Sequence, residues 1–190
     1  MSRRAHVAPL VVLLKGANVG GRRSFRPSVL ARELRPFDVV NVGAAGTFVA
    51  RNPGGPEVLR AEVLGRLPFP ADLMICRGSD ILRLVSDDPF AGHTSGSEIV
   101  QFVSVMAEGR PRPAGLPLEL PGEGEWSLRA LERRGRFVLG LYRRDMKAIG
   151  NLVRLEKVFG LPMTTRSWKT ILAIAGVLGE SPAAAPSPAP

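Results

Sequence analysis

The stretch VAPLVVLLKGANVGG, residues 7–21, determines how the first half of the chain is interpreted. Its apolar run, which ends at Leu14, predicts a buried central strand. Lys15 and a glycine-rich loop follow, and Arg26-Pro27 then predicts the first turn of a helix. The loop is not a P-loop, because its lysine precedes the glycines, and it does not have the GxGxxG spacing. The stretch therefore predicts a strand, a turn and a helix, without a nucleotide-binding loop.

The next segments extend this unit. Strands are predicted over residues 37–42, 47–51 and 71–76, and Pro56 opens a second helix between the last two of them. The order βαββαβ is that of a ferredoxin-like domain. Because the first and third strands are strongly apolar, we expect them to be the central strands of a four-stranded antiparallel sheet, with both helices on one face.

The second half predicts a less regular unit. Ser79 is expected to cap a connecting helix that Asp88-Pro89-Phe90 ends. Four prolines between residues 110 and 124 exclude a regular helix there. The remaining predicted elements are a strand over 98–106, a hairpin of 126–131 with 137–142, and helices over 146–159 and 167–178.

The fold class predicted is α+β, with two ferredoxin-like (α/β plait) units packed together and the second unit irregular. We expect an N-terminal domain over residues 1–90, a linker over 91–97, a C-terminal α/β domain over 98–180 and a disordered tail over 181–190. The tail, SPAAAPSPAP, has too few apolar side chains to pack a core.

Composition excludes several classes of site. Cys76 is the only cysteine and the chain has two histidines, so no disulfide, metal site or cofactor is expected. No apolar run is long enough to cross a membrane, and a cytoplasmic protein is expected. The net charge of +9 comes from 26 basic residues, of which only four are lysines. The basic residues as a whole are spread along the chain. The oligomeric state stays open.

Three segments carry a resemblance to a known family. LLKGANVGG (residues 13–21) resembles LLRGINVGG, GAAGTFV (43–49) stands where a motif like QSGNVVF would, and GLPMTTRSWKTIL (160–172) resembles GVPATTRNWNTVL. Together they resemble the bacterial domain-of-unknown-function family 1697. The resemblance implies two ferredoxin-like units and no established activity.

At five positions the chain replaces an amide or hydroxyl side chain of that family pattern. Ala44, Ala45 and Thr47 stand where the pattern has Gln, Ser and Asn. Ser167 and Lys169 replace two asparagines. The first three changes remove most of the side-chain hydrogen-bonding capacity of the GAAG turn, so a ligand held there by the family would be bound differently or not at all.

The candidate binding site combines the glycine loop with the start of the final helix, where Thr165 or Ser167 is expected to be the cap. Its residues are Lys15, Asn18, Gly20, Gly21, Thr165, Arg166 and Trp168. If the two segments meet, Lys15 and Arg166 place two cations where a small anionic ligand is bound, and Trp168 forms a wall.

Other interpretations stay open at this point. Each motif can serve its own turn, with Lys15 or Arg166 paired to a nearby acid and a positive φ at Gly16, Gly20 or Gly21. The alternative function is nucleic-acid binding by the basic Arg129–Lys147 surface. A second alternative is an enzyme of unrecognised type, because no catalytic residues can be assigned.

Overall fold

The computed structural model describes residues 8–17, 25–93 and 96–179. The predicted tail and part of the glycine loop, including Asn18, Gly20 and Gly21, lie outside these ranges. The elements of the first unit are β1 (Leu10–Leu14), α1 (Pro27–Glu33), β2 (Val39–Asn41), β3 (Thr47–Ala50), α2 (Pro56–Arg66) and β4 (Leu73–Arg77). A single 3₁₀ turn over Arg35–Phe37 joins α1 to β2.

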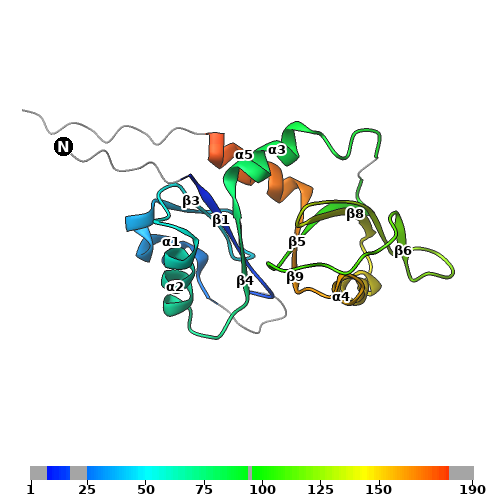
Figure 1. Ribbon diagram of the computed structural model, residues 1–190, viewed down its shortest axis with the longest axis horizontal. Coiled ribbons are helices and arrows are strands. Elements are labelled where there is room, and N and C mark those ends of the chain that lie inside the picture. The colour runs from blue at the N-terminus through cyan, green and yellow to red at the C-terminus, as the bar shows by residue number, and fades with distance from the viewer. Residues whose placement is uncertain (1–7, 18–24, 94–95, 180–190) are drawn as a thin grey trace, which may run out of the picture.

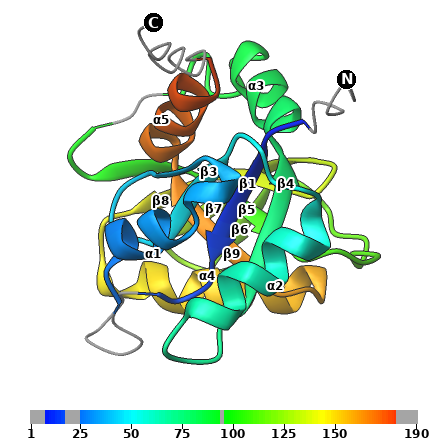
Figure 2. The ribbon, with the colours of Figure 1, turned by 90° about the vertical axis from the view of Figure 1, so that its left-hand side faces the viewer.

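The four strands form an antiparallel sheet in the order β2-β3-β1-β4. The ferredoxin-like order and the central positions of β1 and β3 are confirmed. Helices α1 and α2 lie together on one face of this sheet (Figure 2). Side chains of β1 alternate between the two faces: Val12 and Leu14 pack toward those helices, while Val11 and Leu13 pack into a second core. Since both faces are covered, the strand is an unbroken apolar run.

The second unit consists of one sheet and a helix that precedes its last strand. Its elements are β5 (Ile99–Met106), β6 (Leu118–Leu120), β7 (Leu128–Arg134), β8 (Phe137–Arg143), α4 (Met146–Phe159) and β9 (Met163–Ser167). The strand order is β6-β7-β8-β5-β9, so β9-β5-β8-β7 repeats the ferredoxin-like order with β6 added at one edge. The proline-rich segment between β5 and β7 stands where the first helix of the unit would be. This is the irregularity expected from the sequence.

Of the two caps predicted for the final helix the structure has Ser167, and the predicted cap of the connecting helix, Ser79, is wrong. Thr164, Thr165 and Arg166 belong to β9, in agreement with the strand preference of β-branched residues, and α5 (Trp168–Gly179) begins only after it. Ser167, rather than Thr165, caps α5, because the Thr170 amide donates to its Oγ across 3.3 Å. Helix α3 (Gly78–Ser86) follows β4 directly and has no side-chain cap, so Ser79 does not cap it.

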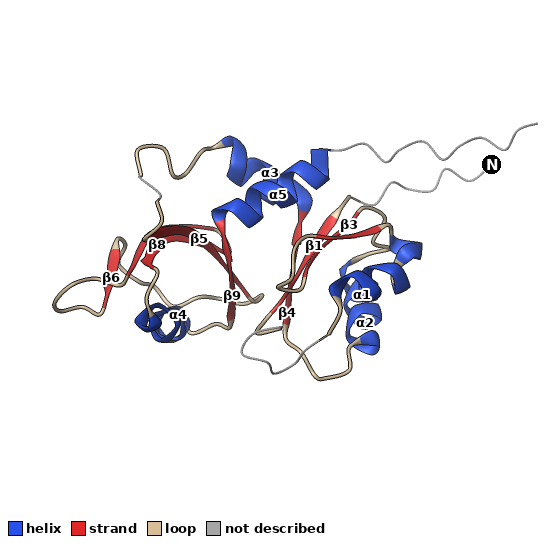
Figure 3. Ribbon diagram, turned by 180° about the vertical axis from the view of Figure 1, so that it is seen from behind, coloured by secondary structure: helices blue, strands red, loops and turns tan. Residues whose placement is uncertain are grey.

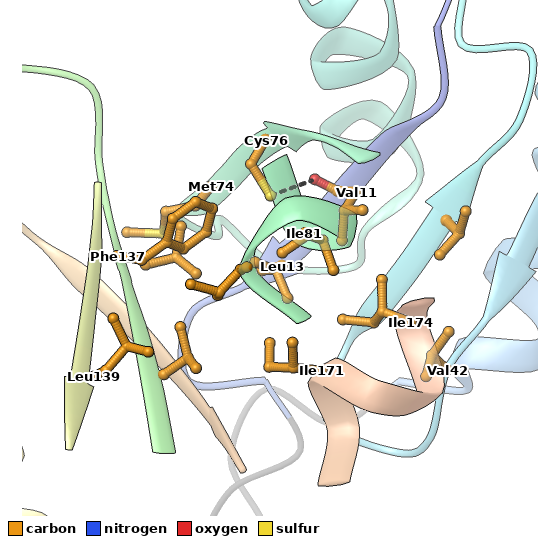
Figure 4. Packing of buried hydrophobic residues seen from close by; sticks show 14 of the residues in the cluster. Val11, Leu13, Val42, Met74, Cys76, Ile81, Phe137, Leu139, Ile171 and Ile174 are labelled. Carbon is orange, nitrogen blue, oxygen red and sulfur yellow. Dashed lines mark hydrogen bonds between the residues drawn. The ribbon is translucent and has the colours of Figure 1, made fainter. Parts of the chain in front are cut away.

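The two sheets face each other across a seam that α3 and α5 cover side by side (Figures 1 and 3). One core fills the seam with residues from both units (Figure 4). It includes Val11 from the first sheet, Val103 and Leu139 from the second, Ile81 from α3 and Ile171 from α5. Helix α5 follows the second sheet in the chain and packs against α3 of the first half. No helix within the described residues has the length and apolarity needed to cross a membrane.

Candidate functional site

The side chain of Arg166 reaches from β9 across the seam into the first unit. Its Nη2 donates to the carbonyl oxygens of Leu14 and Ala45 at 2.9 and 2.8 Å, and its Nε donates to Thr47 Oγ1 at 2.7 Å. Its Nη1 donates to Thr164 Oγ1 and to the Thr165 carbonyl at 2.8 and 2.9 Å. These contacts use all five N–H groups of the guanidinium.

Arg166 is 7% exposed, and each of these partners is a neutral carbonyl or hydroxyl oxygen. Burial lowers the pKa of its guanidinium to about 10. A buried charge is tolerated when its donors are hydrogen-bonded, and here they are. We conclude that Arg166 joins the two units and has no N–H left to hold an anion in this arrangement.

The GAAG turn is shaped to receive this arginine. Gly46 has φ of +67°, and a Cβ there would lie 2.9 Å from the Leu14 side chain. The turn binds Arg166 through main-chain oxygens and Thr47, so Ala44 and Ala45 do not need polar side chains for this contact. The glycine-loop strand and the TTRSW segment therefore do meet, through Leu14 and Arg166.

The other predicted site residues that the structure describes are engaged within the protein. Lys15 Nζ lies 2.8 Å from Glu156 Oε2 on α4, and Gly16 beside it has φ of +63°. Thr165 Oγ1 shares a 2.6 Å hydrogen bond with Ser104. Trp168 packs on the seam core in an edge contact with Phe90, with ring centroids 5.1 Å apart.

Acidic residues pair with the basic Arg129–Lys147 surface. Arg129 contacts Glu119 at 2.6 Å, and Arg143 contacts Glu125 at 2.6 Å. Both guanidinium groups also stack on Trp126, at 4.7 and 4.9 Å from its ring centroid. Such pairing reduces the positive potential that a polyanion would encounter.

A pocket of about 390 Å³ opens between α3 and the β7–β8 turn, at one side of the seam. We call it the seam pocket. Its lining residues are Cys76, Asp80, Arg83, Leu84, Asp87, Arg134, Gly135, Arg136 and Phe137. Cys76, Leu84 and Phe137 are buried and give it an apolar floor, and Phe137 belongs with Met74 to the core that fills the seam (Figure 4).

Most of the charges around the seam pocket are paired. Arg134 Nη1 lies 3.2 Å from Asp87 Oδ2. Arg136 donates to the carbonyls of Met106 and Ile75 at 2.8–2.9 Å and thereby joins the two units. Asp80 and Arg83 on α3 differ: neither side chain has a hydrogen bond or ion pair with any described residue. No three His, Cys, Asp or Glu side chains gather as metal ligands in the described part of the chain.

The Cys76 thiol at the pocket floor is neutral. Burial raises its pKa to about 12, Arg136 partly offsets this, and Asp80 adds to the increase. A thiol in this state is a poor nucleophile, so it contributes apolar surface to the pocket.

A second, more polar pocket of about 340 Å³ lies at the start of α5. Trp168, Ser167, Arg144 and Lys169 are among its lining residues. The side chains of Arg144 and Lys169 form no ion pair within the described ranges. Among the predicted site residues within the described ranges, only Trp168 lines either of these pockets.

Sequence reasoning did not identify the seam pocket. Its residues come from β4, α3 and the β7–β8 turn, which lie in different units and have no shared motif. The available signal was limited to Asp80 and Arg83, three positions apart on a helix with buried Ile81 and Leu84. That spacing places both charges near one face of the helix but does not show which other segment packs against that face.

Comparison with known proteins supports the fold. No family model matches the sequence, and no curated protein matches it. The solved structure of the conserved bacterial protein SP0830 from Streptococcus pneumoniae superposes with a TM-score of 0.58 at 14% sequence identity. The match covers 90% of this chain and 98% of that one. The two proteins therefore have similar folds over nearly the whole of both chains, and at this identity the similarity extends to the fold alone.

Proposed function

We propose that the protein binds a small anionic molecule with an apolar body in the seam pocket. The observation that carries the proposal is the combination of a buried apolar floor, made by Cys76, Leu84 and Phe137, with Arg83 on the wall, whose side chain pairs with none of the described residues. Ligand pockets are typically concave, apolar and equipped with a few convergent polar groups, and they favour domain interfaces. The seam pocket has each of these properties.

The contacts that the basic residues make within the protein indicate where an anionic ligand would bind. Arg166 and Lys15 are bonded within the protein, so they are not available at the same time to an anion. Arg83 is exposed and unpaired within the described chain, so it can turn its planar donors to a carboxylate or phosphate. The apolar part of the ligand would then displace water from Leu84 and Phe137.

Thermal unfolding with isocaproate, a branched aliphatic carboxylate, tests the proposal. A ligand that binds only the folded state raises Tm, by several degrees at about 100 times its Kd. We expect Arg83→Gln to lose most of this rise. Arg154→Gln is the matched control, because Arg154 is exposed on α4, away from the pocket, and the change removes the same charge.

Lys169→Gln tests the competing pocket at the start of α5. If isocaproate binds in the seam pocket, this variant keeps the full rise in Tm. A rise that survives Arg83→Gln but disappears in Lys169→Gln would contradict the proposal and move the site to α5.

We also propose that the chain belongs to domain-of-unknown-function family 1697. The support is the similarity of residues 13–21 and 160–172 to the two motifs of that family. Those segments contact each other through Leu14 and Arg166. An alignment of homologues tests this: sequences carrying one motif should carry the other, and their independent occurrence would count against it.

A further inference from the structure

The wall of the seam pocket carries one charge of each sign that no described residue pairs with. Asp80 and Arg83 are three positions apart on α3, a spacing at which opposite charges commonly pair with each other. They do not do so here, and no other described residue bonds to either side chain. One helix therefore offers a free hydrogen-bond acceptor and a free donor to whatever occupies the pocket.

The other charged residues that line the seam pocket are paired or hydrogen-bonded within the protein. Arg134 is paired with Asp87 at 3.2 Å and with Glu132 at 2.8 Å. Arg136 is held by main-chain carbonyls of both units and lies 3.5 Å from Glu108. A ligand carrying only a carboxylate would satisfy Arg83 and leave Asp80 as a nearby like charge, while a ligand carrying only an amine would leave Arg83 unmatched.

We propose that the seam pocket selects a zwitterion, namely an α-amino acid or a close analogue with an apolar side chain. The carboxylate would meet Arg83, the ammonium would meet Asp80, and the side chain would lie on Leu84 and Phe137. This inference rests on the proposed function and narrows its ligand to one class. A volume of about 390 Å³ is within the range of small-molecule sites and admits an aliphatic side chain.

Three probes of the same shape separate the charges: leucine, isocaproate, which lacks the amino group, and isoamylamine, which lacks the carboxylate. Binding to the wild-type protein is measured by calorimetric titration at low salt. We expect leucine to bind about fivefold more tightly than either analogue, the effect of one partly exposed charge pair.

Two variants assign the charges to residues. Asp80→Asn should weaken leucine about fivefold and leave isocaproate no weaker than before. Arg83→Gln should weaken both leucine and isocaproate and leave isoamylamine unchanged. Arg154→Gln should alter none of the three, and thermal unfolding of each variant checks that it is folded.

The outcomes separate this inference from the proposed function. If isocaproate binds wild-type protein as tightly as leucine, and Asp80→Asn has no effect on either, the zwitterion inference is overturned and the anionic site stands. If neither leucine nor isocaproate binds, both are overturned. Binding of leucine that survives both Asp80→Asn and Arg83→Gln overturns the assignment to the seam pocket.

Discussion

Arg166 Nη2 donates to the Leu14 carbonyl oxygen across 2.9 Å and so ties β9 of the second unit to the end of β1 in the first. The two residues are separated by most of the chain, and the bond is buried. A residue that the sequence suggests as an anion-binding group is thus bonded to neutral oxygens of its own fold. Part of the net positive charge of this protein therefore belongs to a residue that holds the fold together.

Replacing Arg166 with alanine should destabilise the protein strongly. The change removes a donor from the oxygens of Leu14, Ala45 and Thr47, and the Leu14 carbonyl keeps only the Thr164 hydroxyl, at a cost of at least about 3 kcal/mol in free energy of unfolding. Thermal unfolding should show a Tm lowered by about 6–12 °C. Arg166→Lys should fall in between, because an ammonium has three donors instead of five. An alanine variant that melts within about 2 °C of wild type would show that these bonds do not stabilise the fold.

Lys15 and Glu156 should be energetically coupled. Their side chains are 30% and 25% exposed, so solvent screens part of the interaction. A double-mutant cycle with Lys15→Ala and Glu156→Ala, measured by urea unfolding, should give a coupling of about 0.5–1 kcal/mol that shrinks in high salt. Additive single-variant effects would mean that the contact makes no net contribution.

Two glycines of the GAAG turn, which binds Arg166, form a matched pair for testing how closely the turn packs on Leu14. Gly43 and Gly46 both have positive φ, of +77° and +67°, so alanine at either should cost about 1–2 kcal/mol in stability. A Cβ at Gly43 meets open space, whereas one at Gly46 meets Leu14 at 2.9 Å. Gly46→Ala should therefore destabilise by at least about 1 kcal/mol more than Gly43→Ala. Equal losses in chemical denaturation would argue against close packing of the turn on Leu14.

Cys76 makes stability depend on pH in the alkaline range. Its folded-state pKa, about 12, is above the ordinary value of 9.0, so the folded state keeps the thiol proton that the unfolded chain releases. This contribution is fully present below pH 9 and is lost as the pH rises from there toward 12. Between about pH 8 and 10, wild type should lose about 1–2 kcal/mol more than Cys76→Ala does. Parallel pH profiles of the two proteins would contradict the raised pKa.

The sequence predicts the first unit well because local signals agree there. The apolar run ending at Leu14 and the prolines at Pro27 and Pro56 each mark an element that the structure contains. The strand β9 was missed because Trp168, Ile171 and Leu172 give a strong helical pattern directly after it. Only pairing with β5 distinguishes that strand from an extended helix start, and pairing is not a local property.

The candidate site was harder to predict for a similar reason. Sequence reasoning brought the segments of Lys15 and Arg166 together, and the structure joins them through Leu14 and Arg166. It could not foresee that main-chain oxygens would occupy the arginine, since carbonyl positions depend on tertiary packing. The seam pocket forms where α3 meets the β7–β8 turn, and no periodicity in either segment encodes that meeting.

Amide NMR spectra of isotope-labelled protein, recorded while isocaproate is added, test the central claim most directly. If the seam pocket is the binding site, shift changes should cluster at Leu84, Gly135 and Phe137 and be lost in Arg83→Gln. Residues at the start of α5, such as Trp168 and Lys169, should be unaffected. Shift changes centred on Trp168 and Lys169, or no saturable changes, would contradict the claim that this protein binds its ligand at the seam between its two units.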